Sequence, residues 1–192
     1  MSLSLTKGQG LSLVKPDGGS LTRVRLGLGW DAAPRKGLFG SRAREIDLDA
    51  SAILFDANGR EQDAVYFGQL SSRDGSIRHS GDNLTGDGDG DDEQIVVDLD
   101  RIPASIAAVM LVITSYSGQT FNDIDNVFAR VVDISGAERE VVRFDLAEGG
   151  NHTGKVIAKL TREGSGWKFT AIGSIAQGKT FKDVLGFAKA AL

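Results

Sequence analysis

The chain has 192 residues, a length that fits one domain, and its 41% hydrophobic and 25% charged residues exclude wholesale disorder. Cysteine is absent, which excludes disulfides, thiolate catalysis and zinc–cysteine sites, and no apolar run is long enough for a membrane-spanning helix. The net charge is −4, but residues 81–93 hold six acids and no base, so the acidity is local, and no basic tract indicates nucleic-acid binding.

Short alternating strands are predicted along most of the chain. In residues 21–30, apolar side chains from Val24 to Trp30 share one face, while Arg23 and Arg25 lie on the other. Residues 46–55 place an apolar series on one face and begin the other with Asp47 and Asp49. The same patterns predict strands at residues 64–67, 94–99, 107–116, 127–134, 140–146, 156–161 and 166–172, separated by turns such as Asn58-Gly59.

Only the last segment has a clear helical period. Phe181, Val184, Leu185 and Ala188 are spaced i, i+3, i+4 and i+7, which predicts a helix over residues 180–192, and residues 122–126 favour a short helical turn. Many short strands with glycine turns and few helices indicate an all-β fold, an antiparallel two-sheet β-sandwich with a short C-terminal helix. No repeat or linker divides the chain, so residues 1–192 are expected to form a single domain.

The acidic segment carries the strongest chemical signal. Its acids are Asp82, Asp87, Asp89, Asp91, Asp92 and Glu93, interspersed with glycines that let a backbone fold tightly. Crowded carboxylates repel each other, and a hard cation such as Ca²⁺ takes about 6–8 oxygen ligands. Because nearby imidazole is limited to His79 and thiols are absent, zinc and copper are disfavoured. The segment predicts a calcium site; a solvated acidic loop is the alternative.

A single loop rarely completes a metal cage, so a second segment is expected to contribute. Asp47 and Asp49, at i and i+2 of a strand, project from the same face, and Asp31 follows the strand that ends at Trp30. The acidic segment is no EF-hand, because numbering from Asp87 puts aspartate rather than glycine at position 6 and aspartate rather than glutamate at position 12.

Several motifs in order resemble the TerD family of tellurium-resistance and stress-response proteins: Gly27-Leu28-Gly29-Trp30-Asp31, Asp47-Leu48-Asp49-Ala50-Ser51, Gly81-Asp82-Asn83-Leu84-Thr85-Gly86 and Gly88-Asp89-Gly90-Asp91-Asp92-Glu93. The resemblance covers nearly the whole chain. It implies a two-sheet β-sandwich that binds calcium through clustered aspartates in the cytoplasm. The ligand group it implies is Asp47, Asp49, Asp82, Asn83, Asp89, Asp91, Asp92 and Glu93, with direct and indirect ligands left open. Within this resemblance Asp87 lies at a variable position and is ranked below the other acids.

Residues 173–180 satisfy the phosphate-loop pattern between a predicted strand and the predicted helix. Only twelve residues follow Thr180, too few for the remaining βα units of a nucleotide-binding domain, and the other strands favour an antiparallel sheet. A glycine turn with Thr180 as helix N-cap is therefore the preferred interpretation. His79 and His152 lie in polar, glycine-flanked stretches, and both are expected to be solvated loop histidines.

These observations predict a calcium-binding protein that acts as a binding or scaffold module in stress response, not as an enzyme. The ion is expected to join the Asp47 and Asp49 strand to the acidic segment. Partners would be other proteins of the resistance system, including a membrane-associated one, without nucleic acid and without direct insertion into a membrane. Because the N-terminal residues lack a secretory apolar run, a cytoplasmic location is expected. A metal-assisted hydrolase and a nucleotide-binding protein remain the alternatives.

Overall fold

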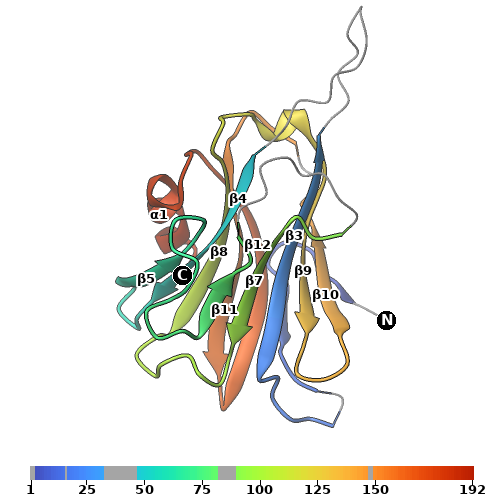
Figure 1. Cartoon of the computed structure of the whole chain (residues 1–192), viewed down its shortest axis with the longest axis vertical. Coiled ribbons are helices and arrows are strands. Elements are labelled where there is room, and N and C mark those ends of the chain that lie inside the picture. The colour runs from blue at the N-terminus through green and yellow to red at the C-terminus, as the bar shows by residue number, and fades with distance from the viewer. Residues whose placement is uncertain (1–2, 16, 33–46, 82–89, 147–148) are drawn as a thin grey trace, which may run out of the picture.

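The computed structural model describes residues 3–15, 17–32, 47–81, 90–146 and 149–192. Within these ranges, only the backbone of Asp125 is described and not its side chain. Two six-stranded sheets pack face to face, with one helix outside (Figure 1). The elements are β1 (Leu3–Ser4), β2 (Gly10–Ser12), β3 (Arg23–Ala32), β4 (Leu48–Phe55), β5 (Glu61–Val65), β6 (Ile77–His79), β7 (Glu93–Asp98), β8 (Ala108–Ser115), the 3-10 helix η1 (Phe121–Asp123), β9 (Ile124–Asp133), β10 (Arg139–Asp145), β11 (Gly154–Glu163), β12 (Gly166–Ala176) and α1 (Phe181–Ala190).

The strand order confirms the predicted two-sheet sandwich. The first sheet runs β1-β10-β9-β3-β7-β6 and the second runs β2-β12-β11-β8-β4-β5. Every pairing between these strands is antiparallel except that of β1 with β10, where Leu3 lies opposite Val142. The first sheet is therefore mixed, and the pattern of glycine turns did not predict its parallel edge.

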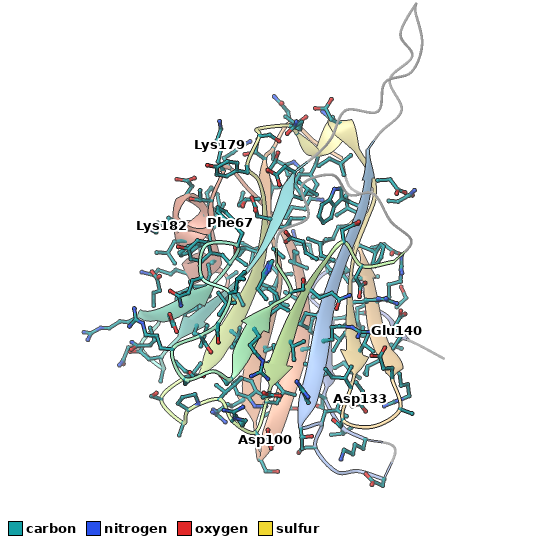
Figure 2. The ribbon with its side chains drawn as sticks, in the orientation of Figure 1. Phe67, Asp100, Asp133, Glu140, Lys179 and Lys182 are labelled. Atoms are coloured by element: carbon teal, nitrogen blue, oxygen red, sulfur yellow. The ribbon has the colours of Figure 1, made fainter. Side chains whose placement is uncertain are left out.

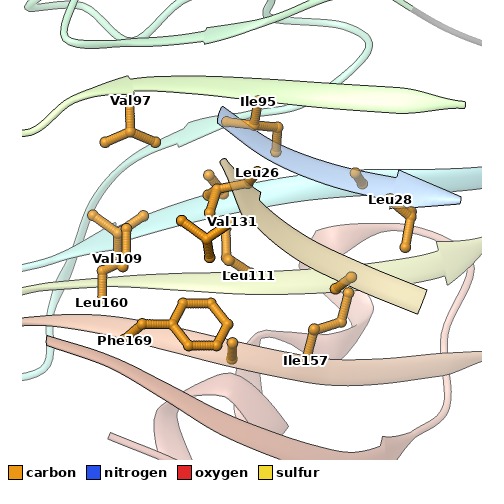
Figure 3. Close-up of a cluster of buried hydrophobic side chains, with 14 of the residues drawn as sticks. Leu26, Leu28, Ile95, Val97, Val109, Leu111, Val131, Ile157, Leu160 and Phe169 are labelled. Atoms are coloured by element: carbon orange, nitrogen blue, oxygen red, sulfur yellow. The ribbon is translucent and has the colours of Figure 1, made fainter. Parts of the chain in front are cut away.

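The main core lies between the sheets. Alternate side chains of β3, β7 and β9 point inward from the first sheet, among them Leu26, Val97 and Val131. They meet Leu111 and Phe169 of the second sheet, as Figure 3 shows. Burial of such side chains contributes on the order of 1.5–3 kcal/mol each, so this layer supplies most of the stabilisation that holds the two sheets together.

A second apolar layer lies between the outer face of the second sheet and α1. Ile53 and Phe55 of β4 pack with Phe181, Val184 and Ala188 of the helix. All eight residues of β4 are consequently buried, including the face that begins with Asp49, for which the sequence indicated no cover. In the described part of the chain no helix is both long and apolar enough to cross a bilayer, and α1 has 10 residues.

One end of the sandwich gathers the segments that carry the predicted metal ligands. β3 ends there and β4 begins there, next to η1 (Figure 1). Ala32 at the end of β3 lies opposite Ile124, which directly follows η1. Tyr116 donates its backbone N–H to the carbonyl of Asp47 at 3.2 Å, which fixes the residue before β4. Asp31 and Asp47, 16 positions apart in the sequence, therefore lie at the same end of the molecule.

Candidate metal centre

The start of β7 is held along β3. Leu28 lies opposite Glu93 and Gly27 opposite Gln94, and the backbone N–H of Asp92 donates to the Leu28 carbonyl at 2.8 Å. Backbone pairing with β3 therefore helps to place the acids 91 to 93. Their three carboxylates enter three different surroundings.

The Asp91 carboxylate lies on the outer face of the first sheet. Arg130 donates its Nε–H to Asp91 Oδ1 at 2.6 Å, and Arg25 Nε lies 3.9 Å from Asp91 Oδ2. The side chain is only 1% exposed, and the pairing with Asp91 raises the pKa of Arg130. Gly27 provides the space, because a Cβ there would lie 2.2 Å from the Asp91 carboxyl carbon.

The Asp92 carboxylate lies at the edge of β3. Its Oδ2 accepts the backbone N–H of Trp30 at 2.9 Å. Burial raises the pKa of Asp92, and the negative charges of Asp31, Asp91 and Glu93 raise it further against the lowering effect of the Trp30 hydrogen bond. Four predicted ligands therefore come within electrostatic reach of each other at this edge.

The Glu93 carboxylate points into the sandwich. Its Oε2 accepts the backbone N–H of Ala50 at 2.6 Å and lies 3.4 Å from Nε2 of His79. Both side chains have no exposed surface, and Gly81 donates its N–H to His79 Nδ1 at 3.1 Å. The expectation of a solvated His79 was wrong, because residues 77–79 form strand β6 and turn the imidazole toward the buried carboxylate.

Asp31 is exposed, and its Oδ2 accepts a hydrogen bond from Nδ2 of Asn126 at 2.7 Å. Asn126 has a φ of 53°, the only positive value at a non-glycine residue in the described chain, and asparagine tolerates this conformation better than most residues. The turn of the β9 backbone thus brings an amide donor to Asp31. The carboxylate is held at the same end as Asp92.

Asp47 and Asp49 lie at the start of β4. Asp49 is 4% exposed and lines a cavity of about 120 Å³ on the helix-covered side of the second sheet, with Thr114, Phe181 and Lys182. The Glu93 to Ala50 hydrogen bond joins β7 to β4 at the next residue. The structure thus brings the two predicted segments into contact through the β4 backbone, whereas the Asp49 side chain faces α1 and the Glu93 side chain faces the sandwich interior.

The remaining predicted ligands, Asp82, Asn83 and Asp89, lie outside the described residues. Within the described ranges, which omit residues 33–46 and 82–89, no three histidine or acidic side chains are grouped closely enough to hold a metal ion. The described acids alone therefore do not form a metal site. Arg25 and Arg130, which contact Asp91, are side chains that sequence reasoning did not single out, although alternation placed Arg25 on the outer face.

Residues 173–180, which match the phosphate-loop pattern, form the end of β12 and the turn into α1. Gly173 to Ala176 belong to β12, where Ser174 lies opposite Val156 of β11. The backbone N–H groups of Lys179 and Thr180 both donate to Asp183 Oδ2 at 3.0 Å, which forms a capping box at the start of α1. A carboxylate therefore occupies the position that a phosphate would need, and the prediction that Thr180 is the N-cap is confirmed.

The second histidine is also buried. His152 is 2% exposed and stacks on Phe121 with ring centroids 4.7 Å apart, so the expectation of solvation was wrong here as well. Its segment is a loop, as predicted, but the 3-10 helix η1 packs the phenylalanine ring over it. The polar, glycine-flanked sequence around His152 gives no sign that the ring of Phe121, 31 positions earlier, covers the imidazole.

The fold and the acids beside β3 and β7 assign the protein to a structural class, the two-sheet β-sandwiches that carry several carboxylates at one end. A family model described as the TerD domain matches residues 1–185. The tellurium resistance protein TerZ of Serratia marcescens is 45% identical over 185 residues, which cover 95% of this chain and 94% of that protein. The stress response protein SCP2 of Bacillus subtilis (strain 168) is 40% identical over 96% of this chain and 98% of its own length.

A solved structure agrees with the sequence matches. The crystal structure of a homologue of the telluride resistance protein TerD from Streptomyces coelicolor A3(2) superposes with a TM-score of 0.65 at 28% identity. The superposition covers 88% of this chain and 96% of that chain. The chain belongs to the TerD family.

Proposed function

We propose that the protein binds calcium at the edge where β3, β4 and β7 meet, and that it serves tellurium resistance or a related stress response as a binding or scaffold module. The observation that carries this proposal is the electrostatic setting of Asp92, whose charged form is disfavoured by burial and by the negative charges of Asp31, Asp91 and Glu93. A divalent cation at this edge would relieve that repulsion.

The donor chemistry fits calcium. The carboxylates of Asp31, Asp47, Asp49 and Asp92 offer oxygen, and these are ligands that Ca²⁺ prefers. The Glu93 contact with Ala50 N–H supports a site shared between two segments, because it holds β7 against β4 beside Asp49. Bound calcium would supply positive charge that holds these strands together, and the family resemblance adds Asp82, Asn83 and Asp89 to the ligand group.

The two buried imidazoles support a binding role over catalysis that uses histidine as acid or base. General acid–base catalysis needs a titratable group that reaches the substrate. His79 and His152, the two histidines of the chain, both have buried rings, His79 against Glu93 and His152 against Phe121. The names of TerZ and SCP2 support the resistance and stress setting, and we place the protein in the cytoplasm with protein partners of the same system.

Isothermal titration of the metal-free protein with Ca²⁺, Mg²⁺ and ATP tests this proposal. Ca²⁺ is expected to bind more tightly than Mg²⁺, because clustered flexible carboxylates suit the larger ion, which accepts more oxygen ligands. ATP is expected to give no heat of binding, since Asp183 occupies the amides at residues 179 and 180. Absence of calcium binding at millimolar concentration would refute the proposal.

A further inference from the structure

The run Asp91-Asp92-Glu93 looks like a uniform set of ligands, but its first member is already engaged. Asp91 Oδ1 lies 2.6 Å from Arg130 Nε, and Arg130 Nη1 also lies 3.1 Å from Oε2 of Glu140, which is labelled in Figure 2. Arg25 Nε lies 3.9 Å from the other carboxylate oxygen, Oδ2, and the Arg25 guanidinium forms two hydrogen bonds with Glu138 at 2.8 and 2.6 Å. The Asp91 carboxylate thus sits between two arginines that are themselves fixed by other acids.

The backbone of β3 is shaped to receive it. Gly27 and Gly29 leave the outer face of the strand without side chains at two alternate positions. A Cβ at Gly27 would collide with the Asp91 carboxyl group, and one at Gly29 would lie 2.4 Å from the Phe128 ring and 2.7 Å from the Gly90 carbonyl oxygen. Residues 90 and 91 therefore lie in a trough along β3 that only glycine leaves open.

We propose that Asp91 is a positioning residue and not a calcium ligand: its ion pairs with Arg130 and Arg25, seated over Gly27, anchor the start of β7 and thereby set the positions of Asp92 and Glu93. The two acids that follow then reach the Trp30 amide and the Ala50 amide. This inference rests on the proposed function in one respect, because the groups that Asp91 positions are those proposed to serve the calcium site.

The sign of one substitution separates an anchor from a ligand. If Asp91 is a ligand, Arg130→Gln frees its carboxylate from a competing cation, and calcium affinity rises or stays the same. If Asp91 is an anchor, Arg130→Gln weakens calcium binding about tenfold or more, in the range seen when groups that orient metal ligands are removed. Gly27→Ala is expected to act in the same direction while leaving every charge in place, because the added methyl group displaces the carboxylate.

The matched control is Arg143→Gln. Arg143 lies in β10 of the same sheet, pairs with Asp145 at 3.0 Å, and covers the Phe128 ring. The substitution Arg143→Gln removes the same charge as Arg130→Gln but does not affect a contact of Asp91, so calcium affinity is expected to change less than threefold. The double variant Asp91→Asn with Arg130→Gln is expected to be no weaker than either single variant, since both break one contact.

A second readout does not depend on calcium. Hydrogen exchange of the Asp92 amide, which donates to the Leu28 carbonyl, is expected to be faster in EDTA for Asp91→Asn, Arg130→Gln and Gly27→Ala than for the wild type or Arg143→Gln. If the wild type binds no calcium, the proposed function fails while this measurement still judges the anchor. Unchanged exchange in the three variants, or calcium binding by Arg130→Gln that is as tight as that of the wild type or tighter, would overturn the inference.

Discussion

Asp92 illustrates how surroundings, rather than residue type, decide the behaviour of one carboxylate in the acidic run. Asp91 contacts arginines, and Glu93 contacts a backbone amide and an imidazole, whereas Asp92 accepts the backbone N–H of Trp30 and faces three negative neighbours. Its charge therefore works against folding in the metal-free protein. The same charge favours binding of a cation, so stability and metal affinity are opposed at this residue.

This opposition predicts a pH dependence. Because the pKa of Asp92 is raised above 3.8 in the folded protein, the folded state holds more protons than the unfolded state between 3.8 and the raised value. The free energy of unfolding therefore falls as pH rises through that window, and the penalty persists above it. Urea unfolding in EDTA at several pH values checks this. As pH rises through the window, the free energy of unfolding of the wild type should fall relative to that of Asp92→Asn.

Asp92→Asn itself should have opposite effects in the two states. Asparagine retains an oxygen for the Trp30 N–H but carries no charge, so the variant in EDTA at neutral pH should be at least as stable as the wild type. Its stabilisation by calcium should fall sharply. Melting curves with EDTA and with Ca²⁺ measure both effects, and a variant that is less stable in EDTA yet keeps the full calcium shift would contradict the assignment.

At this scale the sequence predicted which residue types would cluster, but not how each carboxylate is satisfied. Composition indicates the acids of residues 81–93 directly. The partners Arg130 and Ala50 are 39 and 43 positions away from Asp91 and Glu93, and no local pattern encodes such distances. The burial of His79 follows from the same long-range contact with Glu93.

At the scale of elements, strands longer than five residues were predicted from their alternation, because one face must enter the core. β1, β2 and β6 have only two or three residues, too few to show a period, and sequence analysis missed them. β4 was predicted with one polar face, but α1 covers that face and buries it. An amphipathic helix indicates that it will pack somewhere, not on which strand.

The two-segment site makes a prediction about β4. Asp49→Asn should weaken calcium binding sharply, because it removes one full charge with almost no change in size. Asp56→Asn is the control: Asp56 accepts the N–H groups of Asn58 and Arg60 in the β4–β5 turn, at 2.8 and 2.9 Å, away from β7. Calorimetry on both variants decides, and native affinity in Asp49→Asn would show that β4 does not contribute.

Non-additivity extends this test. Combining Asp49→Asn with Asp92→Asn should cost less calcium affinity than the two single losses predict together, if both carboxylates serve one ion. Strict additivity would instead indicate separate sites at the two strands. The four proteins need only one titration protocol at constant ionic strength.

The capping box of α1 makes a separate prediction. Asp183→Ala removes the acceptor for the amides of residues 179 and 180, and should destabilise the protein by about 1 kcal/mol, a typical cost for loss of a helix cap. Lys179→Ala should leave stability and calcium binding unchanged, because only its backbone takes part. Urea midpoints measure both; ATP binding that depends on Lys179 would favour the nucleotide alternative instead.

At the scale of the whole molecule, calcium should act as a clamp between the sheets, because β3 and β7 belong to one sheet and β4 to the other. A ligand at 100 times its dissociation constant stabilises a folded protein by about 2.7 kcal/mol. For a chain of this size that corresponds to a rise in Tm of roughly 5–10 °C. Scanning calorimetry in EDTA and in Ca²⁺ checks this, with Mg²⁺ as the control; identical curves would contradict the clamp.

The parallel pairing of β1 has a consequence for the order in which the fold can form. Leu3 pairs with Val142, and β2 pairs with residues 168–170 of β12, so both strands need partners that lie more than 130 positions later in the sequence. Between them Leu5 donates to the Arg143 carbonyl and Gly8 to that of Ala171, so this segment crosses from one sheet to the other. The edges formed by β1 and β2 therefore cannot be completed until β10 and β12 have been synthesised, so these two strands must join their sheets late in folding.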